Sequence, residues 1–184
     1  MTLLAGAVSL FVGNAYQAQM PEFASDLGAT EATFRYSALL TSSATGALAA
    51  GVILEVRSLM LPQARTAFIQ VLLWCCLIVG FALTNSFYFA LAFLFFAGFL
   101  ELSFNSMTQT LVQLRAPNHI RGRVIGLFTA SSLGLKTFSG VTVGFGGSYI
   151  GIHSSLSYSA IALFLITIIL FSYSNIKKRS ENLV

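Results

Sequence analysis

The chain has 184 residues, of which 56% are hydrophobic and only 9% are charged. A globular domain carries roughly 25% charged residues, so this composition excludes a soluble domain and predicts an all-α integral membrane protein that contacts membrane lipids. The formal net charge of +4 does not indicate a nucleic-acid partner, because the basic residues of a membrane protein set its topology.

Hydropathy predicts a single bundle of six transmembrane helices over residues 1–184. At about 20 apolar residues per span, the spans cover about 2–20, 34–54, 66–83, 87–114, 124–148 and 156–173. We expect no signal peptide, because no basic leader and no small-residue cleavage site accompany the first apolar segment.

The first span carries Asn14 and Gln17, which lie three residues apart and therefore on one face of a helix. Polar side chains in a bilayer are tolerated best on a face that looks towards the protein interior. We expect this span to stop at Pro21.

The second span is rich in small residues, which let helix backbones approach closely. This pattern predicts a packing face, and contact with a substrate is the alternative. The small residues are Ser42, Ser43, Ala44, Gly46, Ala47, Ala49, Ala50 and Gly51.

The third span is apolar apart from Gln70 and is expected to face lipid. Its adjacent residues Cys75 and Cys76 point about 100° apart on a helix, so they predict no disulfide. They also lack the spacing of a zinc site.

The fourth and fifth spans each carry one charge, Glu101 and Lys136, on either side of a basic turn. Glu101 lies 17 residues before Asn118 in that turn, and Lys136 lies 18 residues after it. Two antiparallel helices therefore bring both charges to the same depth, roughly 20–25 Å from the turn at about 1.5 Å per residue. A charge inside a bilayer core of about 30 Å costs at least about 2.5–3.5 kcal/mol and normally faces a partner or a wet cavity.

Other polar residues lie near these two charges on their helices. We interpret the hairpin as the lining of a polar path for a small molecule. The alternative is that Glu101 and Lys136 form a structural ion pair between packed helices. The candidate path residues are Glu101, Asn105 and Gln109 in the fourth span, Ser132 and Lys136 in the fifth, and Asn14 and Gln17 in the first.

Alternate loops place eight basic residues on one side of the membrane and only Arg35 on the other. This positive-inside pattern predicts a protein of the cell's inner membrane with both termini in the cytoplasm. The eight residues are Arg57, Arg65, Arg115, Arg121, Arg123, Lys177, Lys178 and Arg179.

The polar and the plain spans alternate in a regular order. Spans one, two, four and five carry polar or small-residue faces, whereas the third and sixth are plain. This order is the three-plus-three pattern expected of inverted repeats in transporters.

No residue set predicts enzyme chemistry, a cofactor or a bound metal. The two histidines, His119 and His153, lie near opposite membrane faces, and no span holds an acidic cluster. A channel or a membrane-scaffold subunit is the alternative to a transporter. A channel would need rings of like polar groups from several copies, whereas the polar face here is single and asymmetric.

The end of the fourth span and the turn after it carry a more specific pattern. It runs from Phe104-Asn105-Ser106 through Gln109, Leu111-Val112-Gln113 and Ala116-Pro117 to Arg121-Gly122-Arg123-Val124 and Gly126. This pattern resembles the tenth-to-eleventh helix region of major facilitator superfamily transporters, in the branch of enterobactin-exporter-like and transmembrane-secretion-effector permeases. The resemblance implies that the chain is the carboxy-terminal six-helix half of a twelve-helix transporter.

The loop between the second and third spans is similar to the superfamily's signature loop, in which a glycine is followed four residues later by an acid and then by basic residues. Gly51, Glu55 and Arg57 fit, but Val56 stands where an arginine is usual. We expect the charged residues of this loop and Arg115, Arg121 and Arg123 to be topology-setting charges of the cytoplasmic loops, with a role in a cytoplasmic gate as the alternative.

The resemblance further implies proton-coupled efflux of a small molecule, such as a siderophore or a drug, by alternating access. Glu101 is then the candidate titrating group. Lys136 would neutralise it or contact an anionic substrate. The expected partner is the missing amino-terminal six-helix half.

Overall fold

The computed structural model describes residues 2–13, 15–26, 32–57, 63–117, 119–139 and 151–181. Every regular element within these ranges is a helix, which confirms the all-α class. The elements are α1 (Thr2–Phe11), α2 (Ala15–Asp26), α3 (Ala32–Arg57), α4 (Ala64–Leu83), α5 (Phe87–Arg115), α6 (Arg121–Thr129), the π-helical segment η2 (Ala130–Gly134) and α8 (Ile152–Glu181). Residues 135–139 continue from η2 as α-helix.

Four of the described helices are long and apolar enough to cross a membrane, so the chain is a multi-pass membrane protein. These candidate spans are Thr33–Glu55, Arg65–Leu83, Phe87–Arg115 and His153–Tyr173. The predicted first span is divided between α1 and α2. The predicted fifth span begins in α6 and extends over residues 140–148, which lie outside the described residues.

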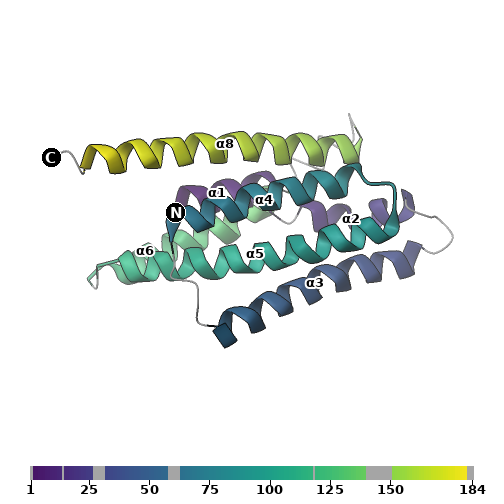
Figure 1. Cartoon of the computed structure of the whole chain (residues 1–184), viewed down its shortest axis with the longest axis horizontal. Helices are drawn as coiled ribbons and strands as arrows, with labels where there is room; N and C mark the ends of the chain where they lie inside the picture. Colours follow the sequence, from purple (N-terminus) through teal and green to yellow (C-terminus); the bar gives the residue numbers. More distant parts are fainter. Residues whose placement is uncertain are drawn as a thin grey trace.

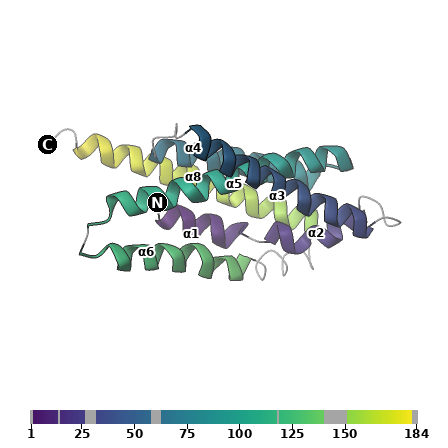
Figure 2. The ribbon, with the colours of Figure 1, turned by 90° about the horizontal axis from the view of Figure 1, so that it is seen from below.

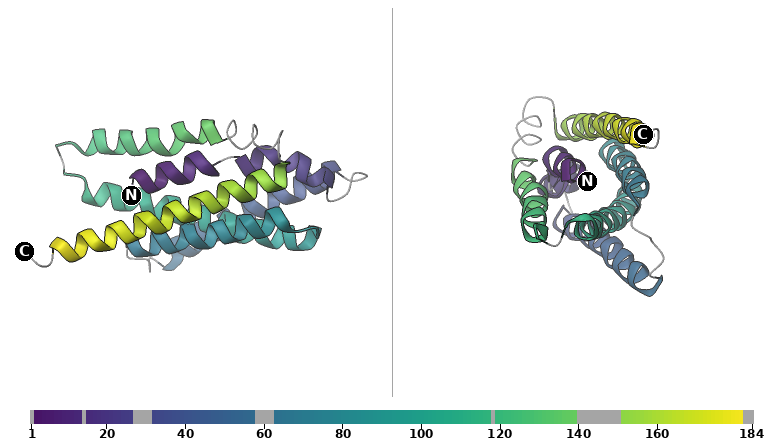
Figure 3. Two further views of the ribbon diagram at one scale, coloured as in Figure 1. Left: turned by 90° about the horizontal axis from the view of Figure 1, so that it is seen from above. Right: turned by 90° about the vertical axis from the view of Figure 1, so that its left-hand side faces the viewer.

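The helices α1 and α2 run through the middle of the bundle. The end-on view of Figure 3 shows α4, α5, α6 and α8 around α1, with α3 outside α5. The contacts agree, because α1 packs against α5, α6, η2 and α8, and α2 packs against α3 and α8. Several of the most completely buried side chains come from these two helices, namely Leu4, Tyr16, Met20 and Phe23.

The helix ends sort to two ends of the bundle. Figures 1 and 2 show the chain's two termini and the α5–α6 turn towards one end. The end of α2, the start of α3 and the α4–α5 turn lie towards the other end. The basic turn at Arg115–Arg123 therefore shares one end of the bundle with both termini.

The first predicted helix is interrupted at Val12 and Gly13. Gly13 has a φ of 29°, a left-handed conformation that favours glycine. The backbone N–H groups of Val12 and Gly13 both donate to the Val8 carbonyl oxygen, at 3.3 and 3.0 Å. A Cβ added to Gly13 would overlap the Ser9 carbonyl oxygen and lie 2.6 Å from Ser139 Oγ. The glycine thus permits both the break and the close approach of residues 135–139.

The helix α2 contains Pro21 and continues to Asp26, so Pro21, where we expect the first span to stop, does not end the helix. Proline removes one helical hydrogen bond. Here the helix continues because the residues on either side of the proline, Met20, Phe23 and Ala24, are buried in the bundle, and their packing offsets that loss.

One face of α4 packs against α5 and α8, and Ile69 and Leu73 on the rest of its surface are exposed, so the expectation that this plain helix faces lipid can apply to one side of it only. Phe68, Val71, Trp74, Ile78 and Phe81 are buried on that face. The two cysteines are free, with Cys75 buried and Cys76 exposed. Hydropathy cannot separate the protein-facing side from the lipid-facing side, because both are apolar.

His153 connects three helix ends. It lies in the first turn of α8, with Nδ1 2.7 Å from the Ala82 carbonyl oxygen of α4 and Nε2 3.0 Å from Asp26 Oδ2 of α2. Its ring packs edge-on against Phe23, with 4.4 Å between the ring centroids. His153, which the sequence places near one membrane face, is therefore a link between helices.

The helices α3 and α5 cross at close range through small residues. A Cβ added to Gly46 would overlap the Phe95 carbonyl oxygen, and one added to Gly98 would overlap the Ser43 carbonyl oxygen. Beside this crossing, Ser42 Oγ donates to the Leu91 carbonyl oxygen at 2.7 Å. The small residues of the second predicted span therefore form a packing face.

We expect Gly46→Ala to lower the free energy of unfolding by about 1–3 kcal/mol, the usual cost of overpacking, because the added methyl group meets main-chain atoms of Phe95 that cannot turn away. Gly51→Ala is the matched control in the same helix, since its Cβ would meet only Leu102 Cδ2 at 3.5 Å. Thermal unfolding in detergent measures both. Equal melting temperatures would contradict the close crossing.

Candidate functional site

Glu101 is the central residue of α5, which runs from Phe87 to Arg115. At about 1.5 Å per residue it lies about 21 Å from either end of the helix. Its side chain is only 17% exposed. A carboxylate at this depth in the hydrocarbon core requires partners from neighbouring helices.

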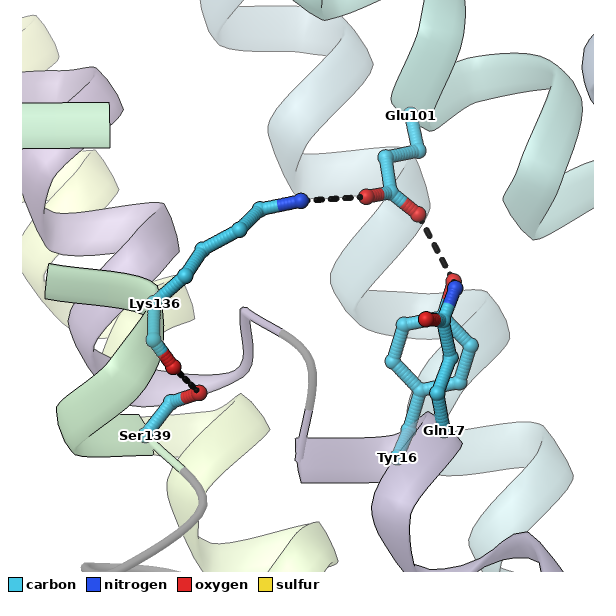
Figure 4. Close-up of polar contacts among 5 residues, drawn as sticks. All are labelled: Tyr16, Gln17, Glu101, Lys136 and Ser139. Carbon is cyan, nitrogen blue, oxygen red and sulfur yellow. Dashed lines mark hydrogen bonds and ion pairs between the residues drawn. The ribbon is translucent and has the colours of Figure 1, made fainter. Parts of the chain in front are cut away.

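Lys136 is the charged partner of Glu101. Its Nζ donates to Glu101 Oε1 at 3.2 Å, as Figure 4 shows. Lys136 belongs to the helical residues 135–139 that follow η2, and Ser139 Oγ donates to the Lys136 carbonyl oxygen at 2.7 Å. The two charges that the sequence places at equal depth are therefore in contact.

Tyr16 is a third member of the cluster, at the start of α2 and just after the break at Gly13. Its hydroxyl donates to Glu101 Oε2 at 2.7 Å and accepts from Gln17 Nε2 at 3.1 Å. Both carboxylate oxygens are thus hydrogen-bonded (Figure 4). Tyr16 is absent from the predicted site residues, because a tyrosine in an apolar helix has the pattern of a core residue, and its only signal is its place beside Gln17.

Trp74 of α4 packs edge-on against Tyr16, with 6.2 Å between the ring centroids. Its indole N–H has no hydrogen-bond partner among the described residues. Trp74 also lines a small apolar void together with Glu101. Because it is the only tryptophan of the chain, its fluorescence reports on the surroundings of the ion pair.

A cleft of about 380 Å³ lies beside Glu101, between α2, α3 and α5. The side-chain amide of Asn105 makes no hydrogen bond to another described residue and is available to a solute or to water. Apolar and small residues form the rest of the wall. The lining residues are Gln17, Leu40, Ser43, Ala44, Ala47, Gly98, Glu101, Leu102 and Asn105.

The cleft brings together only some of the predicted path residues. Gln17, Glu101 and Asn105 line it. Gln109 is exposed elsewhere on α5, and Ser132 Oγ donates to carbonyl oxygens of its own helix. Asn14 lies outside the described residues. The part of the chain that the structure describes holds no group of three His, Cys, Asp or Glu side chains that could bind a metal.

The residues predicted for the gate or the topology-setting loops are not among the residues that line the cleft. Arg121 Nε and Nη2 both donate to the Gln113 carbonyl oxygen, at 3.1 and 2.8 Å, and so satisfy a carbonyl group near the end of α5. Arg115, Arg123 and Glu55 are exposed. A Cβ added to Gly51 would touch the side chain of Leu102. The side chain of Arg57 lies outside the described part of the chain.

The whole chain, residues 1–184, matches the family model described as transmembrane secretion effector. No curated protein and no solved structure matches the chain.

We expect Tyr16→Phe to lower the free energy of unfolding by about 1–3 kcal/mol, because it removes the hydroxyl donor to Glu101 and leaves the carboxylate oxygen without that partner. Tyr158→Phe is the matched control, since Tyr158 is exposed. Chemical unfolding followed by Trp74 fluorescence measures both variants. A Tyr16→Phe protein as stable as the control would show that the hydroxyl contributes nothing to holding Glu101.

Proposed function

Because the chain belongs to the transmembrane secretion effector family of major facilitator transporters, we propose that it is the carboxy-terminal six-helix half of a proton-coupled exporter of small molecules. In this proposal α1 with α2 forms the first span, and the helix that begins with α6 forms the fifth. The four remaining spans are α3, α4, α5 and α8. The six spans would form the three-plus-three inverted repeat common in transporters.

The observation that supports this function is the position of Glu101 between an internal cation and an open cleft. The two carboxylate oxygens bind Lys136 and Tyr16, and the same residue lines the cleft. A proton that reached Glu101 would remove its negative charge and weaken the attraction to Lys136. In alternating access, the two bundles move about such a site near the bilayer midplane.

The residues that line the cleft support the proposal that the exported molecule binds there. Gln17, Ser43 and Asn105 offer hydrogen-bonding groups, and Leu40 and Leu102 offer apolar contact. A small molecule with polar groups on an apolar body suits this combination. A siderophore-like or drug-like compound belongs to this class.

The polar cleft also supports the proposal that a second six-helix bundle packs against this one. Polar groups at this depth are tolerated where they face protein or water, not lipid tails. An amino-terminal six-helix half would cover the cleft and close it into a central path. The end of the bundle that carries the termini and the basic turn (Figure 1) would face the cytoplasm, where Gly51, Glu55, Arg57, Arg115, Arg121 and Arg123 would contribute to the inner gate.

We expect Glu101→Gln to abolish proton-driven export by the complete transporter in proteoliposomes, because an amide keeps the shape of the side chain but cannot exchange a proton. Glu22→Gln is the matched control, since Glu22 is exposed in α2, away from the cleft. Folded protein levels are compared by size-exclusion chromatography. Proton-driven export by Glu101→Gln would remove this residue from the coupling role, and flux that does not saturate would favour a channel.

Replacing both charges separates a transport role from a purely structural ion pair. We expect Lys136→Met alone to lower the free energy of unfolding by about 1–3 kcal/mol, less than the 3–5 kcal/mol of fully buried pairs, since the two side chains are 24% and 17% exposed. The double variant Glu101→Gln/Lys136→Met should recover much of this stability but not transport. A stable double variant that still exports would favour the structural pair.

A further inference from the structure

The fifth span changes from α-helix to π-helix just before Lys136. The segment η2, Ala130–Gly134, lies between α6 and the α-helical residues 135–139. A π-bulge holds one residue more than the α-helix it interrupts and often occurs at functional sites. The direction of every side chain after the bulge therefore depends on whether the bulge is present.

We propose that η2 is a register switch that removes Lys136 from Glu101 when the segment becomes α-helical, an inference that rests on the proposed function of this site. Conversion to α-helix would turn the following residues by about 100° and shift them by about 1.5 Å, the rotation and rise of one residue. Leu135 would then take the place of Lys136 opposite Glu101. Phe138 would take the place of Ser139.

The two forms of the segment suit different states of Glu101. We call the form with the bulge the π register and the form without it the α register. In the π register the Glu101 carboxylate faces the Lys136 ammonium at 3.2 Å. In the α register it faces an aliphatic side chain and keeps the hydroxyl of Tyr16. A carboxylate that loses its cation in an apolar site is costly, so the α register favours a protonated Glu101 or one paired with a cationic group of a solute in the cleft.

The surroundings of η2 leave room for this change on its outer side. Leu133 and Phe138 are 61% and 60% exposed, and a Cβ added to Gly134 would meet no atom within 4 Å. The bulge also has local hydrogen-bond support, because Ser132 Oγ donates to the carbonyl oxygens of Phe128 and Thr129 at 2.9 and 3.3 Å.

The inner side is tight and links the switch to the break in the first span. Ser139 occupies the slot beside Gly13, where even a methyl group on the glycine would lie 2.6 Å from Ser139 Oγ. A phenylalanine cannot enter this slot unless α1 and α2 separate at Gly13. The register change therefore requires the break at Gly13 to move with it.

Exchange of two neighbouring residues tests whether the second register exists, without a transport measurement. We expect Lys136→Leu to lower the melting temperature, because Glu101 loses its cation. The double variant Leu135→Lys/Lys136→Leu should recover at least half of that loss, because the α register places the new lysine opposite Glu101. Thermal unfolding followed by Trp74 fluorescence measures both. A double variant that is no more stable than Lys136→Leu, or that fails to fold, would overturn the switch.

A deletion tests whether export needs both registers. Removing Leu133 deletes the extra residue and should leave a continuous α-helix with Lys136 still opposite Glu101, so the variant should melt near the wild-type temperature. Its export in proteoliposomes should fall to the level of empty vesicles. Removal of Leu127, a similarly exposed leucine in the regular helix α6, is the matched control and should destabilise the protein, because it turns the buried Phe128 out of its place.

The outcomes separate this inference from the proposed function. If the Leu133 deletion exports at the wild-type rate, or fails to fold like the Leu127 deletion, the register switch is wrong. Glu101→Gln is assayed in parallel. If Glu101→Gln retains proton-driven export, the proposed coupling role is wrong. If Glu101→Gln loses export while the Leu133 deletion exports normally, only the register switch is overturned.

Discussion

A carboxylate at the centre of an apolar helix must receive its hydrogen-bond and charge partners from the rest of the fold. Glu101 obtains them from two segments that are distant in sequence, since Tyr16 of α2 binds one oxygen and Lys136 binds the other. Without them the side chain would hold an unpaired charge about as far from water as the bilayer allows. The positions of the first and fifth spans follow from this requirement.

The irregular parts of the described helices lie around the same ion pair. The break at Gly13 begins α2 so that Tyr16 reaches Glu101, and the π-helical segment η2 directs Lys136 towards it from the other side. Ser139 packs against Gly13, so the two irregular points are in contact. A discontinuous helix at the level of the binding site is a common feature of secondary transporters. Here one broken helix, α1 with α2, and one continuous helix with a π-helical turn meet beside one carboxylate.

Small residues serve two purposes in α3 and α5. Gly46 and Gly98 bring the two backbones together, while Ala44, Ala47 and Gly98 leave space for the cleft. A larger side chain would push the two helices apart at their crossing and would fill the cleft beside it. The packing face of α3 and α5 and the wall of the cleft are therefore parts of one helix–helix contact.

The sequence alone determines the membrane class, the extent of most of the helices and the equal depth of Glu101 and Lys136. These features depend on composition and on the fixed rise of an α-helix, which convert directly from residue numbers to distance. Spacing also selects Gln17 and Asn105, which line the cleft, but it selects Gln109 equally, which does not. The tertiary structure alone decided that Tyr16, 85 residues from Glu101, completes the site, that α2 continues past Pro21, and that one face of α4 is buried. In this chain nearly every helix face is apolar, so hydropathy cannot tell a face that packs against another helix from one that meets lipid. Only the packing of the helices decides which faces are in contact.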